Sequence, residues 1–157
     1  MRVYTLVGLF LLLKLIMSYT CYTDGSYSSS KNQMGVAIIF LHNGKLILEY
    51  SRMYHGGTNN KAELAAVVIA LRMVKLPIKE LTIVTDSMYV IGGGSLGWKR
   101  NKNFKLWEEF DKQYSRVLKI CPNVRFKHVK GHQKDDSEDT KWNNKVDFMA
   151  TNSSNML

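Results

Sequence analysis

The chain has few cysteines and no internal repeat. Its 157 residues include only two cysteines, Cys21 and Cys121, which lie far apart in the sequence. This spacing is not that of a zinc site, and two cysteines argue against a fold that depends on disulfides. Such cysteine usage is typical of a reducing compartment, so we expect an intracellular protein of the cytoplasm or the nucleus. The length corresponds most simply to one domain.

Acidic residues are also scarce. The chain has 13 acidic against 22 basic residues, which gives a formal net charge of +9. This excess favours an acidic partner, and nucleic acid is the commonest one, although a soluble basic protein without such a partner is the simpler alternative. Apolar residues make up 45% of the chain, enough to bury a real core.

No hydrophobic run is long enough for an ordinary membrane span. Residues 1–16 read MRVYTLVGLFLLLKLI, an apolar stretch behind Arg2 that is interrupted by Lys14. It resembles the core of a signal peptide or an anchor, but no small-x-small cleavage site follows before Cys21. We favour an upstream extension, with Met17 as the working start, or a loosely attached leader. The predicted domain is therefore 17–157, and membrane contact or secretion would require the leader to be retained.

Hydrophobic periodicity predicts the order of the elements. Three strands joined by hairpins come first, followed by a helix, a strand, two helices, a strand and a last helix. The expected strands are 18–23, 35–41, 45–55, 81–86 and 124–129, and the expected helices are 58–75, a short one that ends at 92–94, 106–120 and 141–152. This order predicts an α/β fold with a mixed five-stranded sheet, three strands antiparallel and the others parallel, flanked by helices.

Four carboxylates lie at comparable places in this scheme. Asp24 is expected to end the first strand and Asp86 the fourth, Glu63 to lie in the first turns of the long helix, and Asp147 near the start of the last helix. Carboxylates gathered at one sheet edge repel unless cations neutralise them, and oxygen ligands suit Mg²⁺ or Mn²⁺. Two such ions about 4 Å apart can activate a water for phosphodiester hydrolysis. The alternative is four unrelated carboxylates, with Asp86 merely capping a helix.

Five short motifs follow one another along the chain. They are Tyr22-Thr23-Asp24-Gly25-Ser26, Thr58-Asn59-Asn60-Lys61-Ala62-Glu63-Leu64, Val84-Thr85-Asp86-Ser87-Met88-Tyr89, Val129-Lys130-Gly131-His132 and Asn143-Asn144-Lys145-Val146-Asp147. Together they resemble type 1 ribonuclease H, of the retroviral-integrase superfamily, over nearly everything from Ser18 to Asn152. One such motif is a weak signal, whereas five in order, each on the expected element, are a strong one.

The resemblance implies a ribonuclease H-like fold and a metal-dependent endonuclease. Such an enzyme cuts the RNA strand of RNA–DNA hybrids and leaves 5′-phosphate and 3′-hydroxyl ends. Matched motif by motif, Asp24, Glu63, Asp86 and Asp147 would hold two Mg²⁺ ions, with Mn²⁺ as a substitute and Asp24 bridging both. His132 would be a mobile histidine that assists proton transfer or product departure; the alternative is an ordinary loop histidine.

Recognition of RNA requires contacts to the 2′-hydroxyl. By resemblance, the residues beside the minor groove and the phosphates are Gly25, Ser26, Thr58, Asn59, Asn60, Ser87 and Met88. The family uses glutamine or methionine at the position of Met88. The alternative role for Asn59 and Asn60 is simple helix capping. Thr58 or Asn59 can cap the start of this helix.

A basic segment, 95–105, stands where many members of this family carry a longer basic protrusion. It includes Trp98, Lys99 and Arg100, which could meet bases and phosphates. The alternative is a solvated loop with Trp98 packed inward. Because the segment is short, we expect weaker hybrid binding than in members with the full protrusion.

The sequence is also compatible with three other functions. They are a related nuclease or integrase-like enzyme of the same fold, a catalytically silent nucleic-acid-binding module, and a membrane-tethered or secreted protein of unrelated role. The first is not expected to combine the motifs around Glu63 and His132, and the second usually loses acidic residues that this chain keeps. We expect a monomer that needs no obligate protein partner.

Overall fold

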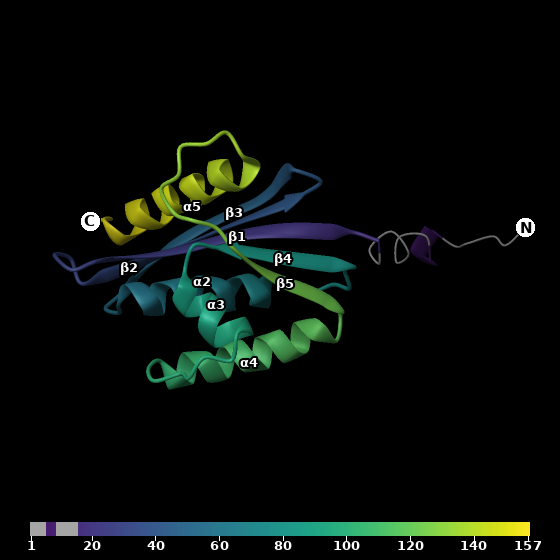
Figure 1. Ribbon diagram of the computed structural model, residues 1–157, viewed down its shortest axis with the longest axis horizontal. Helices are drawn as coiled ribbons and strands as arrows, with labels where there is room; N and C mark the ends of the chain where they lie inside the picture. Colours follow the sequence, from purple (N-terminus) through teal and green to yellow (C-terminus); the bar gives the residue numbers. More distant parts are fainter. Residues whose placement is uncertain (1–5, 9–15) are drawn as a thin grey trace, which may run out of the picture.

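A five-stranded mixed sheet forms the centre of the molecule, in the order β3-β2-β1-β4-β5 (Figure 1). The computed structural model describes residues 6–8 and 16–157. The strands are β1 (Ser18–Ser28), β2 (Gln33–His42), β3 (Lys45–His55), β4 (Glu80–Thr85) and β5 (Asn123–His128). The helices are α2 (Asn59–Met73), α3 (Met88–Ser95), α4 (Phe104–Leu118) and α5 (Glu138–Ser154). The predicted fold class and element order are confirmed.

The first strand is longer than predicted. β1 pairs antiparallel with β2 from Tyr19↔His42 to Ser28↔Gln33, so residues 24–28, which follow the predicted strand, also belong to β1. Asp24 therefore lies within β1 and not at its end, and the prediction that it ends the strand is wrong. The tight hairpin explains the difference, because pairing with β2 supplies backbone partners to polar residues that have little intrinsic preference for a strand.

The parallel half of the sheet aligns β1 with β4. Their register pairs Tyr22 with Val84, and β5 pairs in parallel with the other side of β4. Crossover connections between parallel strands need a helix, and α2 supplies the one that leads from β3 to β4. Thr58 caps α2, because its side chain accepts a hydrogen bond from the backbone N–H of Lys61.

Helices cover both faces of the sheet (Figure 1). On one face, residues such as Cys21 and Ile38 pack with the buried stripe of α2 and with α4. On the other, the alternate residues Tyr22 and Ile39 pack against α5. The two-residue alternation of β1 and β2 thus feeds two cores, which fixes the register because a one-residue slip would exchange them.

The sequence predicted that the short helix ends at the glycine triplet 92–94, but these glycines lie inside α3. The helix continues to Ser95, and the absence of side chains lets three aromatic rings press on it. Cβ atoms added at Gly92, Gly93 and Gly94 would lie within 3.1 Å of Trp98, Trp107 and Phe110, respectively. The glycines are therefore contact points for aromatic packing.

The last helix also starts earlier than predicted. Ser137 caps α5, and the helix runs from Glu138 to Ser154. Asp147 consequently lies in the middle of α5, which corrects its predicted place near the helix start. The early start follows from the Ser137 cap and from Glu138 and Asp139 in the first turn, where negative charge is favourable.

Most of the predicted leader, 1–16, lies outside the described residues. Leu6, Val7 and Ile16 are described, and all three are exposed. No helix within the described ranges combines the length and the hydropathy that a membrane crossing requires. The division into a leader and a domain starting at Met17 stays a prediction.

Candidate active site

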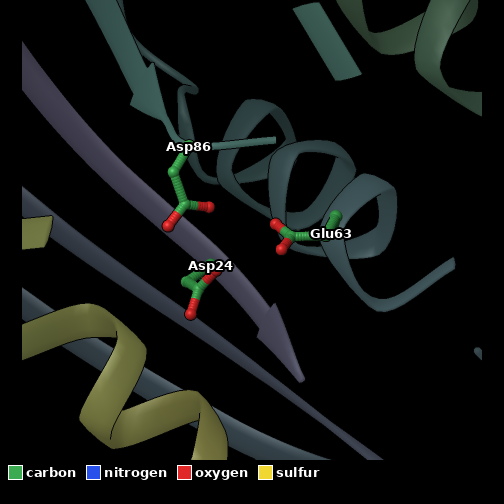
Figure 2. Close-up of side chains that lie close together, drawn as sticks. All are labelled: Asp24, Glu63 and Asp86. Atoms are coloured by element: carbon green, nitrogen blue, oxygen red, sulfur yellow. The ribbon is translucent and has the colours of Figure 1, made fainter. Parts of the chain in front are cut away.

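Three of the four predicted carboxylates meet just beyond the end of β4, where β1 continues past it. Asp24 and Asp86 each lie two residues beyond the paired residues Tyr22 and Val84, so the parallel register brings them to the same level. Glu63 approaches from α2. Figure 2 shows the three carboxyl groups turned toward one another from β1, from the end of β4 and from a helix. One oxygen from each lies within 4.8 Å of the other two.

A missing side chain lets Glu63 come this close. A Cβ atom at Gly25 would lie 2.2 Å from the carbonyl carbon of Ala62 and 2.2 Å from the amide nitrogen of Glu63. The first turns of α2 thus rest directly on the backbone of β1, one residue after Asp24. The backbone of Gly25 also lowers the pKa of the Glu63 carboxyl, which partly offsets the effect of burial. In the Asp-Gly pair, Asp24 supplies one carboxylate and Gly25 allows Glu63 to lie beside it.

The cluster is electrostatically costly for the protein alone. Burial, followed by the charge of Asp86, raises the pKa of Asp24 to about 8. Burial, followed by the charge of Asp24, raises the pKa of Glu63 well above its usual range. Among the described residues, Glu63 Oε2 is buried and has no hydrogen-bond partner. Carboxyl groups in this arrangement need either protons or cations.

Asp147 and His132 lie beside this cluster. Asp147, on α5, is close enough to contribute to the raised pKa of Asp24, but it is not one of the three whose oxygens lie within 4.8 Å. The Nδ1 atom of His132 lies 3.7 Å from Oδ2 of Asp147, and the imidazole is 83% exposed. His132 has a positive φ of 54°, an uncommon backbone conformation for a residue other than glycine. The structure thus brings all five predicted catalytic residues into one region.

Three of the residues expected beside the minor groove of the hybrid lie at the start of α2, and they differ in their contacts. Thr58 is the helix cap, so its hydroxyl is engaged with the backbone. Asn59 does not cap the helix; its Oδ1 accepts a hydrogen bond of 2.8 Å from the backbone N–H of Tyr27 on β1. Asn60 is exposed on the first turn of α2. Asn59 therefore links α2 to β1, and Asn60 faces solvent.

The other groove candidates lie on β1 and at the start of α3. Gly25 is used for the close approach described above, and Ser26 accepts a hydrogen bond of 3.2 Å from the hydroxyl of Ser154. Ser87 caps α3 through Val90 and is nearly buried. Met88, the first residue of α3, is 39% exposed and directly follows the Asp-Ser pair. Of these four, Met88 presents the largest free side chain.

The short basic segment combines internal contacts with exposed groups. Trp98 is half-exposed, yet one part of its ring packs on Gly92. The Arg100 guanidinium forms two hydrogen bonds with Asp111, of 2.7 and 2.9 Å, and its Cζ lies 4.2 Å from the centre of the Trp107 ring. Lys99 is exposed. Arg100 therefore holds the segment to α4. Of the three predicted contact residues, Lys99 and the exposed part of Trp98 are the ones available to a ligand.

Sequence reasoning missed one residue in this region, Asn143. It lies on α5 in the same motif as Asp147, one helical turn earlier, and its side chain is almost completely buried. Its Nδ2 donates a hydrogen bond of 3.3 Å to Oδ2 of Asp86. The four-residue spacing from Asp147 was the available signal, since residues at this spacing share a helix face.

Comparison with known proteins now adds to this geometry. The family model described as RNase H matches residues 17–155. Ribonuclease H of Acetivibrio thermocellus is 34% identical over 144 residues, which cover 83% of this chain and 90% of that protein. Ribonuclease H of Cereibacter sphaeroides is 36% identical over 129 residues, or 71% of this chain and 81% of that protein.

A solved structure agrees at the level of the fold. The crystal structure of LC11-RNase H1 in complex with an RNA/DNA hybrid superposes with a TM-score of 0.70 at 22% identity, covering 87% of this chain and 96% of that one. The matched region contains every carboxylate of the cluster. The chain belongs to the ribonuclease H family, whose enzymes hydrolyse the RNA of RNA–DNA hybrids.

Proposed function

We propose that this chain is an active endonuclease that cuts the RNA strand of RNA–DNA hybrids with two Mg²⁺ ions and leaves 5′-phosphate and 3′-hydroxyl ends. The observation that carries the proposal is the cluster of Asp24, Glu63 and Asp86, whose oxygens lie within 4.8 Å of one another. Membership of the ribonuclease H family supports the substrate class.

The carboxylates fit a hard divalent cation. Oxygen ligands alone favour Mg²⁺ or Mn²⁺ over zinc. Glu63 Oε2 is buried without a partner among the described residues, and a bound cation would remove the cost of leaving it so. Burial and the neighbouring negative charge of Asp86 also raise the pKa of Asp24, and a bound cation would favour its ionised form. Asp24, Glu63 and Asp86 would hold the metal, with Asp147 as the further ligand from α5.

When bound, the ions would activate the attacking water and stabilise the leaving oxygen. The chain's own residues have separate tasks. The close contact at Gly25 keeps Glu63 against Asp24. His132 is exposed on its loop beside Asp147, where its imidazole can exchange a proton with solvent and with a departing product.

Substrate contacts follow the same surface. Asn59 is fixed to β1, and Asn60 and Met88 are exposed beside the carboxylates, where they can contact the minor groove. The 2′-hydroxyl is both a donor and an acceptor, so an asparagine amide can recognise it. Lys99 and the exposed part of Trp98 can meet phosphates and bases farther along the hybrid.

Cleavage of an end-labelled RNA–DNA hybrid tests the proposal. With Mg²⁺, the wild type should cut the RNA strand internally, and the products should carry 5′-phosphate and 3′-hydroxyl ends. Asp86→Asn should bind the hybrid without cutting it, and duplex DNA should remain intact. Binding by wild type without cleavage would instead favour a silent nucleic-acid-binding module.

We also propose that residues 17–157 form the working enzyme, as a monomer inside the cell. A chain that starts at Met17 should then keep full activity and elute as a monomer in gel filtration. N-terminal sequencing of the native protein tests the leader. A mature end before residue 17, together with recovery in a membrane fraction, would contradict this part of the proposal.

A further inference from the structure

The carboxylate of Asp86 contacts a buried amide that has no assigned role. Asn143, on α5, is 1% exposed, and its Nδ2 lies 3.3 Å from Asp86 Oδ2. An ionised carboxylate can only accept hydrogen bonds, so the amide nitrogen, and not the amide oxygen, must face it. The direction of this hydrogen bond therefore follows from the chemistry of the two groups.

Asp86 is confined on other sides as well. Its backbone carbonyl oxygen lies 3.2 Å from Nε2 of His128. A Cβ atom at Gly131 would lie 2.7 Å from Asp86 Oδ2, so the loop after β5 closes tightly over this oxygen. Between the loop and α5, the side chain of Asp86 has little room to rotate away from Asp24 and Glu63.

The other end of the Asn143 amide makes the residue expensive for the fold. Its Oδ1 is buried and has no hydrogen-bond partner among the described residues. A buried carbonyl oxygen without a partner is destabilising, and an apolar side chain of similar size would avoid this cost. Stability alone therefore does not explain an asparagine here, whereas the bond to Asp86 does.

We propose that Asn143 is a positioning residue, which fixes the carboxylate of Asp86 in the orientation that a divalent cation requires. The inference rests on the metal site proposed above. One hydrogen bond to Oδ2 leaves further lone pairs on both carboxylate oxygens for the cation. Since Asn143 and Asp147 are one turn apart, α5 contributes a positioning group and a carboxylate from one face.

Metal binding by full-length variants tests this role without measuring cleavage. In Mn²⁺ titration calorimetry, Asn143→Leu and Asn143→Ala should bind roughly 10- to 100-fold more weakly than wild type, the usual effect of losing a group that orients a metal ligand. Asn143→Leu should melt no lower than wild type in EDTA. In hybrid cleavage, kcat should fall while KM stays unchanged, because Asn143 does not touch the substrate.

Asn144→Ala is the matched control. Asn144 is the neighbouring residue on α5, but it is exposed and its Nδ2 bonds the carbonyl oxygen of Gln133 instead. This variant should bind Mn²⁺ as wild type does. Unchanged Mn²⁺ affinity in both Asn143 variants, or an equal loss in Asn144→Ala, would overturn the inference.

A second measurement separates this inference from the proposed function. In EDTA, a double-mutant cycle of Asn143→Leu and Asp86→Asn should show a coupling of about 2- to 10-fold in the unfolding constant. Coupling without Mn²⁺ binding by wild type would contradict the proposed metal site but retain the Asn143–Asp86 pair. Absence of coupling would overturn the pair itself.

Discussion

Gly25 on β1 lies directly against the backbone of Glu63 on α2. A Cβ atom at Gly25 would stand 2.2 Å from the amide nitrogen of Glu63 and 2.2 Å from the carbonyl carbon of Ala62. Packing between a strand and a helix is ordinarily set by side chains. Here two backbones touch, so the distance between Asp24 and Glu63 is fixed by rigid parts of the chain and not by flexible side chains.

Gly25→Ala should therefore damage both the fold and the site. The added methyl group meets backbone atoms that cannot rotate away, and we expect a loss of about 1–3 kcal/mol in the free energy of unfolding. Urea denaturation measures this loss, and Mn²⁺ titration should show weaker binding because α2 is pushed away from β1. Gly44→Asn is a suitable control, since a Cβ atom at Gly44 would have no neighbour within 4 Å and asparagine tolerates its positive φ. Equal effects of both substitutions would contradict this explanation.

Asp24→Asn should abolish cleavage and yet stabilise the metal-free protein. The pKa of Asp24 is about 8 in the fold against an ordinary value of 3.8, so folding favours the protonated form. The contribution of this group to stability is complete below about pH 4 and is lost as the pH rises toward 8 and above. In EDTA, the free energy of unfolding of the variant should exceed that of wild type by about 1–3 kcal/mol at pH 9 and by much less at pH 4.

Urea denaturation across this pH range, for both proteins side by side, measures the difference. Comparison with the variant is necessary because other carboxylates titrate in the same range. Glu63→Gln should also become more stable than wild type as the pH rises, since burial and the charge of Asp24 raise the pKa of Glu63 as well. If the difference in free energy of unfolding between Asp24→Asn and wild type became smaller with rising pH, the expected cost of ionising the buried cluster would be wrong.

The parts of the fold governed by periodicity could be predicted from the sequence. α2 and β4 differ from the predicted bounds by one or two residues, because apolar spacing sets their buried faces. β3 has the predicted bounds although it is mostly exposed, because glycines with positive φ at 44 and 56–57 mark its two ends. The extent of β1 could not be predicted in this way. Asp24 and the polar residues after it resemble a loop locally, and only pairing with β2 makes them a strand.

The candidate site divides along the same line. Asp24, Glu63, Asp86 and Asp147 stand in motifs that the chain order alone reveals. The role of Arg100 could not be predicted from such a motif, because its partner Asp111 and the ring of Trp107 contact it only through the packing of α4. Contacts that depend on how a loop folds back onto a helix leave no periodic pattern in a single sequence.

Lys99 and Arg100 should respond differently to substitution by alanine. Arg100 is paired with Asp111 and stacked on Trp107, so Arg100→Ala should lower the free energy of unfolding by about 1–2 kcal/mol. Lys99 is exposed, so Lys99→Ala should leave stability unchanged and weaken hybrid binding.

Hybrid affinity measured at several salt concentrations distinguishes the two residues. Loss of one phosphate contact at Lys99 should reduce the dependence of log K on log salt by about 0.7–0.9. A reduced salt dependence for Arg100→Ala, with no change for Lys99→Ala, would show that the assignment is reversed. A salt dependence of the wild type that equals that of members with the full basic protrusion would contradict the expected weaker binding.

Asp24, Glu63 and Asp86 are expected to hold divalent metal. Anomalous diffraction from crystals soaked in Mn²⁺ tests it most directly, with Asp86→Asn crystals treated in the same way. We expect manganese peaks among the three carboxylates in the wild type, within about 2.0–2.3 Å of their oxygens, and weaker or missing peaks in the variant. A wild-type map with no manganese at these carboxylates, from crystals of a protein that cuts hybrids in the same buffer, would show that the three carboxylates are not the metal site.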